Sequence, residues 1–195
     1  MTKAEFWNWF EENLNQLEYF MISKSQDYTI YDELTEKLQD YNELLIPELY
    51  IDEYDKFVLI ISCDGVREGI PAVENLMENI KSYEGWTIRK FRSQTDFKTI
   101  PYRGVNLNKK DILLKWEANE DGKFDLDIFI KGFHLLNDDL KAATFLHLDH
   151  CIGEYNMMTR IGYVEISMLG FFQSKKGLRN LNDLKLHLNE LDRSN

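Results

Sequence analysis

Cysteine and long apolar runs are both scarce in this chain of 195 residues. The two cysteines, Cys63 and Cys151, are too few for a disulfide framework, and we expect them to be buried thiols. The longest uninterrupted apolar run, residues 57–61, has five residues, whereas a bilayer span needs about twenty. The start of the chain lacks the charged-then-apolar pattern of a signal peptide. The sequence therefore predicts a soluble, cytoplasmic protein with no membrane partner.

Basic residues are outnumbered by acidic ones, 23 against 34, which gives a formal net charge of −11. Residues 1–64 contain 15 acids and 4 bases, whereas residues 65–195 contain 19 of each. This surplus argues against nucleic-acid binding, which depends on releasing counterions from phosphates. It favours an acidic surface that attracts a basic protein partner. The alternative is that acidic helices only keep the chain soluble.

Apolar residues at steps of three and four predict helices at both ends of the chain. The opening helix begins at a capping box formed by Thr2 and Glu5. A second helix, over 30–46, has Thr29 as its cap, so residues 1–46 form an acidic helical part. A leucine pattern predicts a C-terminal helix over 178–192, which either docks on the protein's own core or forms a homodimer seam.

Strand patterns occupy the middle of the chain. The apolar run 57–62, a helix from Pro71 and a strand over 86–92 predict a βαβ crossover. Alternation over 111–118 and 123–131 predicts a β-hairpin.

A helix over 138–158, capped by Asn137, and a strand over 163–168 follow this hairpin. We therefore predict one α+β domain over 1–195, with its sheet and crossover helices in 57–168. Its mixed sheet has about five strands with the hairpin at its centre, and the N-terminal, middle and C-terminal helices pack against it.

Potential metal ligands gather in the segment 147–154. On a helix, His147, Cys151 and Glu154 fall on one face, and His150 and Glu154 are one turn apart. Imidazole, thiolate and carboxylate are ligands that zinc prefers. The alternative is that the apolar side of this helix packs on the sheet, and no second metal motif supports the cluster. These four residues are the metal candidates, but we expect no cofactor.

Asp64 is the second candidate for chemistry. It follows the C-terminal end of the 57–62 strand, where ligands bind in open α/β sheets. The residues after it lack the glycine spacing and lysine of a phosphate loop, and Asp-Gly is also an ordinary turn. The catalytic candidates are therefore Asp64, Asp149 and Glu154, and no established catalytic motif accompanies them.

Three segments are together similar to a family of uncharacterised bacterial proteins. They are the FWNWF run over 6–10, the stretch 61–86 that contains Asp64-Gly65 and Gly69, and an LDxxxGExxxxTxIxxxE pattern over 148–165. The resemblance implies a bacterial, cytoplasmic α+β protein and brings no activity with it. The family pattern does not include His147, His150 or Cys151.

The leading functional hypothesis is a non-catalytic module that binds a basic protein through the acidic residues 1–64, for example in an immunity- or antitoxin-like role. The competing hypothesis is a metal-dependent hydrolase-type enzyme built on the 147–154 helix. A third is a small-ligand pocket lined by Trp86, Trp116 and tyrosines.

Overall fold

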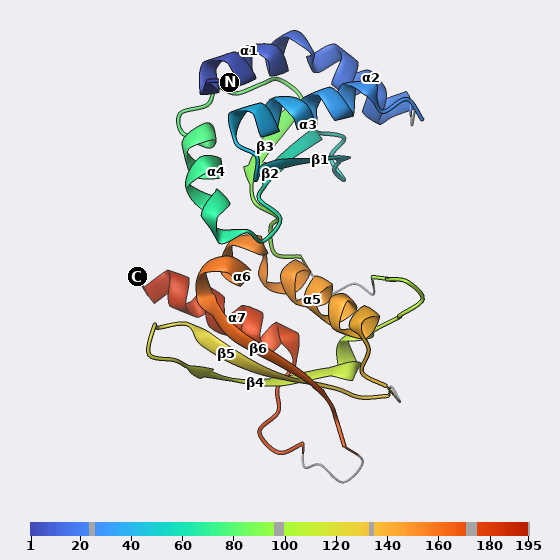
Figure 1. Ribbon diagram of the computed structural model, residues 1–195, viewed down its shortest axis with the longest axis vertical. Helices are drawn as coiled ribbons and strands as arrows, with labels where there is room; N and C mark the ends of the chain where they lie inside the picture. The colour runs from blue at the N-terminus through green and yellow to red at the C-terminus, as the bar shows by residue number, and fades with distance from the viewer. Residues whose placement is uncertain (24–25, 96–99, 133–134, 171–174, 195) are drawn as a thin grey trace. The chain divides into compact units, whose positions relative to one another are not determined.

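The computed structural model of this chain describes residues 1–23, 26–95, 100–132, 135–170 and 175–194 (Figure 1). The chain divides into two compact units, Met1–Arg92 and Ser93–Asn195. The described residues form seven α-helices and two three-stranded sheets, which confirms the α+β class. The prediction of a single sheet of about five strands is wrong, and the single domain over 1–195 stays a prediction. Residues 96–99, part of the loop expected after the 86–92 strand, lie outside the described residues.

Three helices begin the N-terminal unit: α1 (Lys3–Glu12), α2 (Leu14–Ser23) and α3 (Thr29–Tyr41). The predicted capping box is present at Thr2 and Glu5. The opening helix is interrupted at Asn13, whose side-chain amide donates a 2.8 Å hydrogen bond to the Trp9 carbonyl. This local bond ends α1 and separates it from α2.

Helix α3, which was predicted over 30–46, differs from its prediction at both ends. Thr29 is its first residue rather than its cap, and the Asp27 carboxylate accepts hydrogen bonds from the Thr29 backbone and hydroxyl. The helix ends at Tyr41 rather than at residue 46, because residues 46–51 form a strand.

The sheet of the N-terminal unit has the order β1-β2-β3, with β1 over Ile46–Ile51, β2 over Phe57–Ser62 and β3 over Trp86–Lys90. β1 is antiparallel to β2, and β2 is parallel to β3. Helix α4 (Ile70–Met77), with Pro71 in its first turn, connects the parallel pair and confirms the predicted βαβ crossover. β1 was not predicted because it contains Pro47, which a strand tolerates mainly at a sheet edge.

An aromatic cluster forms much of the core of the N-terminal unit. Phe10 packs edge-on against both Tyr83 and Trp86, with ring centroids 5.3 Å and 5.2 Å apart. The Trp7 indole nitrogen donates a 2.9 Å hydrogen bond to the Leu76 carbonyl at the end of α4. α1 is therefore tied to β3 by ring contacts and to α4 by a buried hydrogen bond.

The C-terminal unit contains a second sheet of the order β4-β5-β6, over Ile112–Ala118, Phe124–Ile130 and Ile161–Met168. The predicted hairpin is confirmed: β4 and β5 are antiparallel, while β5 and β6 are parallel. Both units therefore share one connectivity, a hairpin followed by a helical crossover to a parallel strand. No strand of the first sheet pairs with a strand of the second among the described residues, so the two sheets are separate.

The helices of this unit are α5 (Asp138–Ile152), α6 (Glu154–Arg160) and α7 (Leu181–Ser194). Asn137 caps α5 as predicted, with its side chain accepting from the Leu140 amide. The long helix expected over 138–158 is broken at Gly153, whose φ of 83° is a left-handed conformation that suits glycine.

Helices α5 and α7 lie on the same side of the β4-β5-β6 sheet in Figure 1. Four leucines of α7 predicted a seam; Leu181, Leu184 and Leu188 are fully buried in the core of this unit, and Leu191 is partly buried. The C-terminal helix therefore packs on its own unit. Among the described residues, no helix is long and apolar enough to cross a membrane.

Gly69 provides a direct test of packing in the N-terminal unit. A Cβ atom added there would lie 2.4 Å from the Cβ of buried Cys63, closer than atoms can approach. We expect Gly69→Ala to lower the free energy of unfolding by about 1–3 kcal/mol, as overpacked cores do. Urea unfolding measures the change, and Glu68→Ala at the exposed neighbouring position should change it by less than about 0.5 kcal/mol. Equal stability of the two variants would contradict this packing.

Candidate functional site: a groove between two acidic helices

The candidate ligand His147 is a buried structural residue. Its Nε2 accepts a 3.2 Å hydrogen bond from the Ile100 amide, so Nδ1 carries the proton and donates to the Ala143 carbonyl. Burial lowers the pKa of the imidazole, and nearby His150 adds to this effect, although the Ala143 bond acts in the opposite direction. Both ring nitrogens are occupied by backbone groups, which leaves neither in position to bind a metal.

The other candidates in this segment lie in different surroundings. Cys151 and Glu154 are buried, and the Cys151 thiol donates to the Leu181 carbonyl at 3.6 Å. His150 and Asp149 are partly exposed. Within the described ranges, no three His, Cys, Asp or Glu side chains are grouped in a way that could hold a metal ion. The packing alternative describes this helix better than the metal site does.

Asp64 takes part in an ion-pair network at the carboxyl end of the parallel strands. The Arg92 guanidinium lies 3.1 Å from the Asp64 carboxylate and 2.8 Å from that of Glu48. Arg92 is mostly buried, whereas the Asp64 side chain is 68% exposed. Asp64 follows β2, Arg92 follows β3 and Glu48 lies in β1, so the ion pairs connect all three strands. This geometry gives Asp64 a structural role.

The two tryptophans of the expected small-ligand pocket, Trp86 and Trp116, lie in different compact units. Trp86 is buried in the N-terminal unit and donates a 2.8 Å hydrogen bond to the Glu18 carboxylate. Trp116 belongs to the C-terminal unit, where its ring contacts His187 and the Arg179 guanidinium. Each ring already has its packing partners inside its own unit.

The negative charge belongs almost entirely to one unit. Residues 1–92 contain 19 acids and 9 bases, a net charge of −10, whereas residues 93–195 contain 15 acids and 14 bases, a net charge of −1. The acidic residues 1–64 therefore lie entirely within the first compact unit. A charged partner would be attracted to the N-terminal unit.

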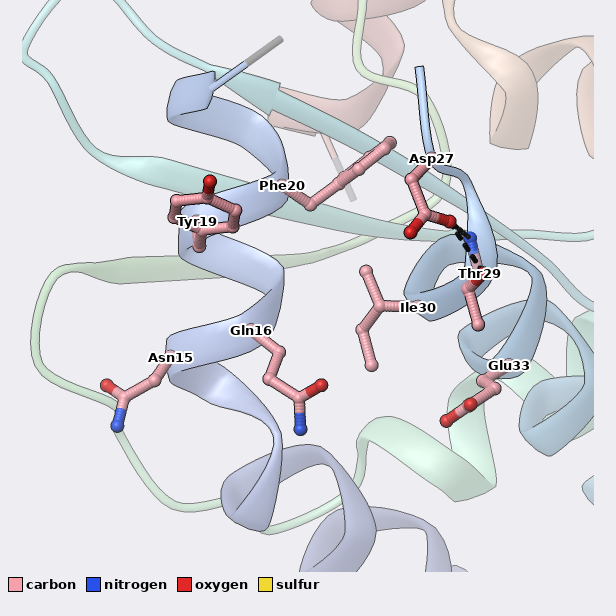
Figure 2. A pocket seen from close by; sticks show the side chains of 8 residues that line it. All are labelled: Asn15, Gln16, Tyr19, Phe20, Asp27, Thr29, Ile30 and Glu33. Atoms are coloured by element: carbon pink, nitrogen blue, oxygen red, sulfur yellow. Dashed lines mark hydrogen bonds between the residues drawn. The ribbon is translucent and has the colours of Figure 1, made fainter. Parts of the chain in front are cut away.

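A groove of about 400 Å³ lies between α2 and the start of α3 in this acidic unit (Figure 2). Phe20 and Gln16 extend from α2 toward α3, while Ile30 and Glu33 extend from α3 toward α2. Tyr19 lies at the outer side of α2 and is 71% exposed. The full lining comprises Asn15, Gln16, Tyr19, Phe20, Asp27, Thr29, Ile30 and Glu33.

The two walls of the groove are fixed from within the unit. Leu17 on α2 is fully buried, and its neighbour Glu18 accepts the Trp86 hydrogen bond. Phe20 is held between Tyr28 and Tyr31, with ring centroids 5.5 Å and 6.2 Å away. The apolar floor of the groove is therefore a packed surface on rigid helices.

Two carboxylates line the groove, and one of them, Asp27, is stabilised by hydrogen bonds. Asp27 precedes α3 and accepts the two hydrogen bonds from Thr29 at 2.6 Å and 3.0 Å. The hydroxyl bond, followed by the amide bond, lowers the pKa of Asp27, which keeps this carboxylate ionised. Glu33, the fifth residue of α3, is the second carboxylate of the lining.

This combination of groups suits one kind of ligand. A lysine or arginine side chain has an apolar stem and a charged head, so the stem can pack on Phe20 and Ile30 while the head reaches a carboxylate. Tyr19 at the rim offers a ring face for a cation–π contact. Among the lining residues that the structure describes, none is cationic and would oppose such a ligand.

The sequence located the acidic segment but not the groove. Leu17 lies on the buried face of α2. A residue two positions further along a helix points to the other side, so this spacing could have predicted that Tyr19 is exposed.

No protein-family model matches this chain. The curated proteins contain no match to it either. The resemblance to uncharacterised bacterial proteins stays a prediction.

The burial of His147 predicts a pH dependence of stability. The unfolded imidazole has its ordinary pKa near 6.5 and the buried one a lower value, so the unfolded chain gains the proton first as the pH falls. Stability should be constant above about pH 7.5 and decrease below about pH 6.5.

The urea midpoint at about pH 7.5 and about pH 5 measures this difference. His147→Gln should flatten the decrease, whereas His150→Gln at the partly exposed neighbouring position should keep most of it. An undiminished decrease in His147→Gln would assign the effect to other groups.

Proposed function

We propose that the chain is a non-catalytic binding module that recognises a basic protein through the groove between α2 and α3. The observation that carries the proposal is the groove itself, which combines the carboxylates of Asp27 and Glu33 with an apolar floor in the unit that holds the net charge of −10. A lysine or arginine from the partner fills the groove, and the surrounding charge increases the association rate.

Exposed apolar side chains extend this surface beyond the groove. Tyr19, Ile22 and Tyr28 are each more than half exposed and lie on or next to the same two helices. Tyrosine is enriched among residues that dominate binding energy, because it supplies contact area at a small entropic cost. We assign these three side chains to the contact area around the inserted cation.

One concrete form of this function is an immunity- or antitoxin-like role in a bacterial cytoplasm, in which the acidic unit occludes a basic surface of a toxin. The competing metal-dependent enzyme draws no support from the described residues of the 147–154 segment, since His147 is bonded to backbone on both nitrogens.

The binding proposal predicts that charge in the groove matters more than charge elsewhere on the unit. Asp27→Asn/Glu33→Gln removes two carboxylates while preserving an oxygen acceptor for Thr29. Glu53→Gln/Glu68→Gln removes two exposed carboxylates outside the groove and is the matched control. We expect the groove variant to bind the partner at least about tenfold more weakly and the control to bind almost normally.

The measurement is a pull-down from a native lysate at low salt, followed by titration of the recovered partner. Affinity for a basic partner should fall as ionic strength rises, because salt screens exposed charges. Equal binding by the two variants would place the interface outside the groove. A complex indifferent to salt would contradict the electrostatic basis of the proposal.

A further inference from the structure

The outer edge of β6 has no strand partner among the described residues of the C-terminal unit. β6 is eight residues long and pairs on one side with β5, and no described strand pairs with its other side. The opposite edge of the same sheet is covered at Leu114 of β4, which exchanges two backbone hydrogen bonds with Arg179. Long open edges are templates for pairing with another strand.

The register identifies which backbone groups face outward. The Leu169 amide donates to the Ile130 carbonyl of β5, so the odd-numbered residues at this end of β6 face inward. Backbone groups alternate along a strand, which directs those of Val164, Ile166 and Met168 to the open edge. Their side chains pack against the core of the unit, so these three positions are held in an extended conformation.

Side chains along the edge form a small depression of about 240 Å³. It is lined by the four consecutive residues 163–166 together with Lys141 and Phe145 of α5. Successive side chains of a strand point to opposite faces of the sheet. A depression that is lined by four consecutive residues of β6 therefore lies along the edge of the strand, where both faces meet. Tyr163 is 67% exposed and Phe145 is 40% exposed.

We propose that β6 pairs antiparallel with β6 of a second copy of this chain, which joins the two sheets into one of six strands. The edge is balanced in charge, with Lys141 and Glu165 in the same depression, and the unit has a net charge of only −1. A balanced edge suits an identical strand better than it suits a basic segment. A two-fold pairing of this kind uses the same surface on both copies.

The position of Glu165 selects the register. Centring the two-fold axis on Glu165 would place two carboxylates directly opposite each other, which is unfavourable. Centring it on Val164 or Ile166 places Glu165 opposite the hydroxyl of Tyr163 or Ser167 of the second copy. Either hydroxyl can donate to the carboxylate, so the dimer is self-complementary in these two registers.

Ile166→Pro tests the pairing directly. The Ile166 amide faces the open edge, so proline removes no hydrogen bond within the unit but blocks the edge. Sedimentation of the full chain over a range of concentrations should show a monomer–dimer equilibrium, weakened at least about tenfold in the variant. Hydrogen exchange at the Val164 and Ile166 amides should slow as the concentration of the parent chain rises.

A second variant avoids altering the core. Tyr163→Glu/Ser167→Glu places new carboxylates opposite Glu165 in both registers, at side chains outside the apolar core. Leu135→Glu/Leu186→Glu adds the same charge at two exposed positions away from β6 and should dimerise normally. A chain that stays monomeric at every concentration would overturn the proposal. A dimer that tolerates both β6 changes, or leaves the β6 amides unprotected, would overturn it as well.

Discussion

Burial of the aromatic cluster between α1 and β3 is the interaction on which the acidic unit depends. Ten net negative charges repel one another, yet two unit charges 10 Å apart in water repel by only about 0.4 kcal/mol before salt screens them. Burying one large apolar side chain stabilises the fold by about 1.5–3 kcal/mol. Phe6, Phe10 and Trp7 are all buried, so each contributes several times the repulsion of one such charge pair and helps to hold α1 on the sheet.

Packing within the unit also holds the two walls of the groove. α2 is held by Leu17 and by the bond from Trp86 to Glu18, and α3 by its buried Leu34 and Leu38. A rigid groove loses little conformational entropy when a ligand binds, so more of the contact energy appears as affinity. The two units differ in what they offer a partner: one presents concentrated negative charge, and the other presents a nearly neutral strand edge.

Features that depend on local sequence were predictable. The capping box at Thr2, the cap at Asn137 and the hairpin of β4 and β5 each follow from a few neighbouring residues, and all three are confirmed. The breaks at Asn13 and Gly153 were not predicted, because the apolar period continues across them and only backbone geometry ends the helices.

Features that depend on long-range pairing were predicted less well. Two hairpin-and-crossover patterns are compatible with one sheet or with two, and β1 was missed because Pro47 resembles a helix stop. The acidic segment was evident from composition alone, whereas the groove requires Phe20 of one helix to meet Ile30 and Glu33 of another. Likewise, the spacing of His147 and Cys151 indicated a ligand cluster, but spacing does not reveal that Ile100 bonds to the imidazole.

The central claim is that the groove, rather than the acidic surface in general, recognises a basic side chain. Its most direct test is an NMR titration of the isotope-labelled full chain with a hexa-arginine peptide at low ionic strength. The account predicts saturable shifts concentrated in the amides of α2 and the start of α3, and their loss when Asp27 and Glu33 are neutralised. Shifts spread evenly over the acidic residues of the N-terminal unit, or centred in the C-terminal unit, would contradict it.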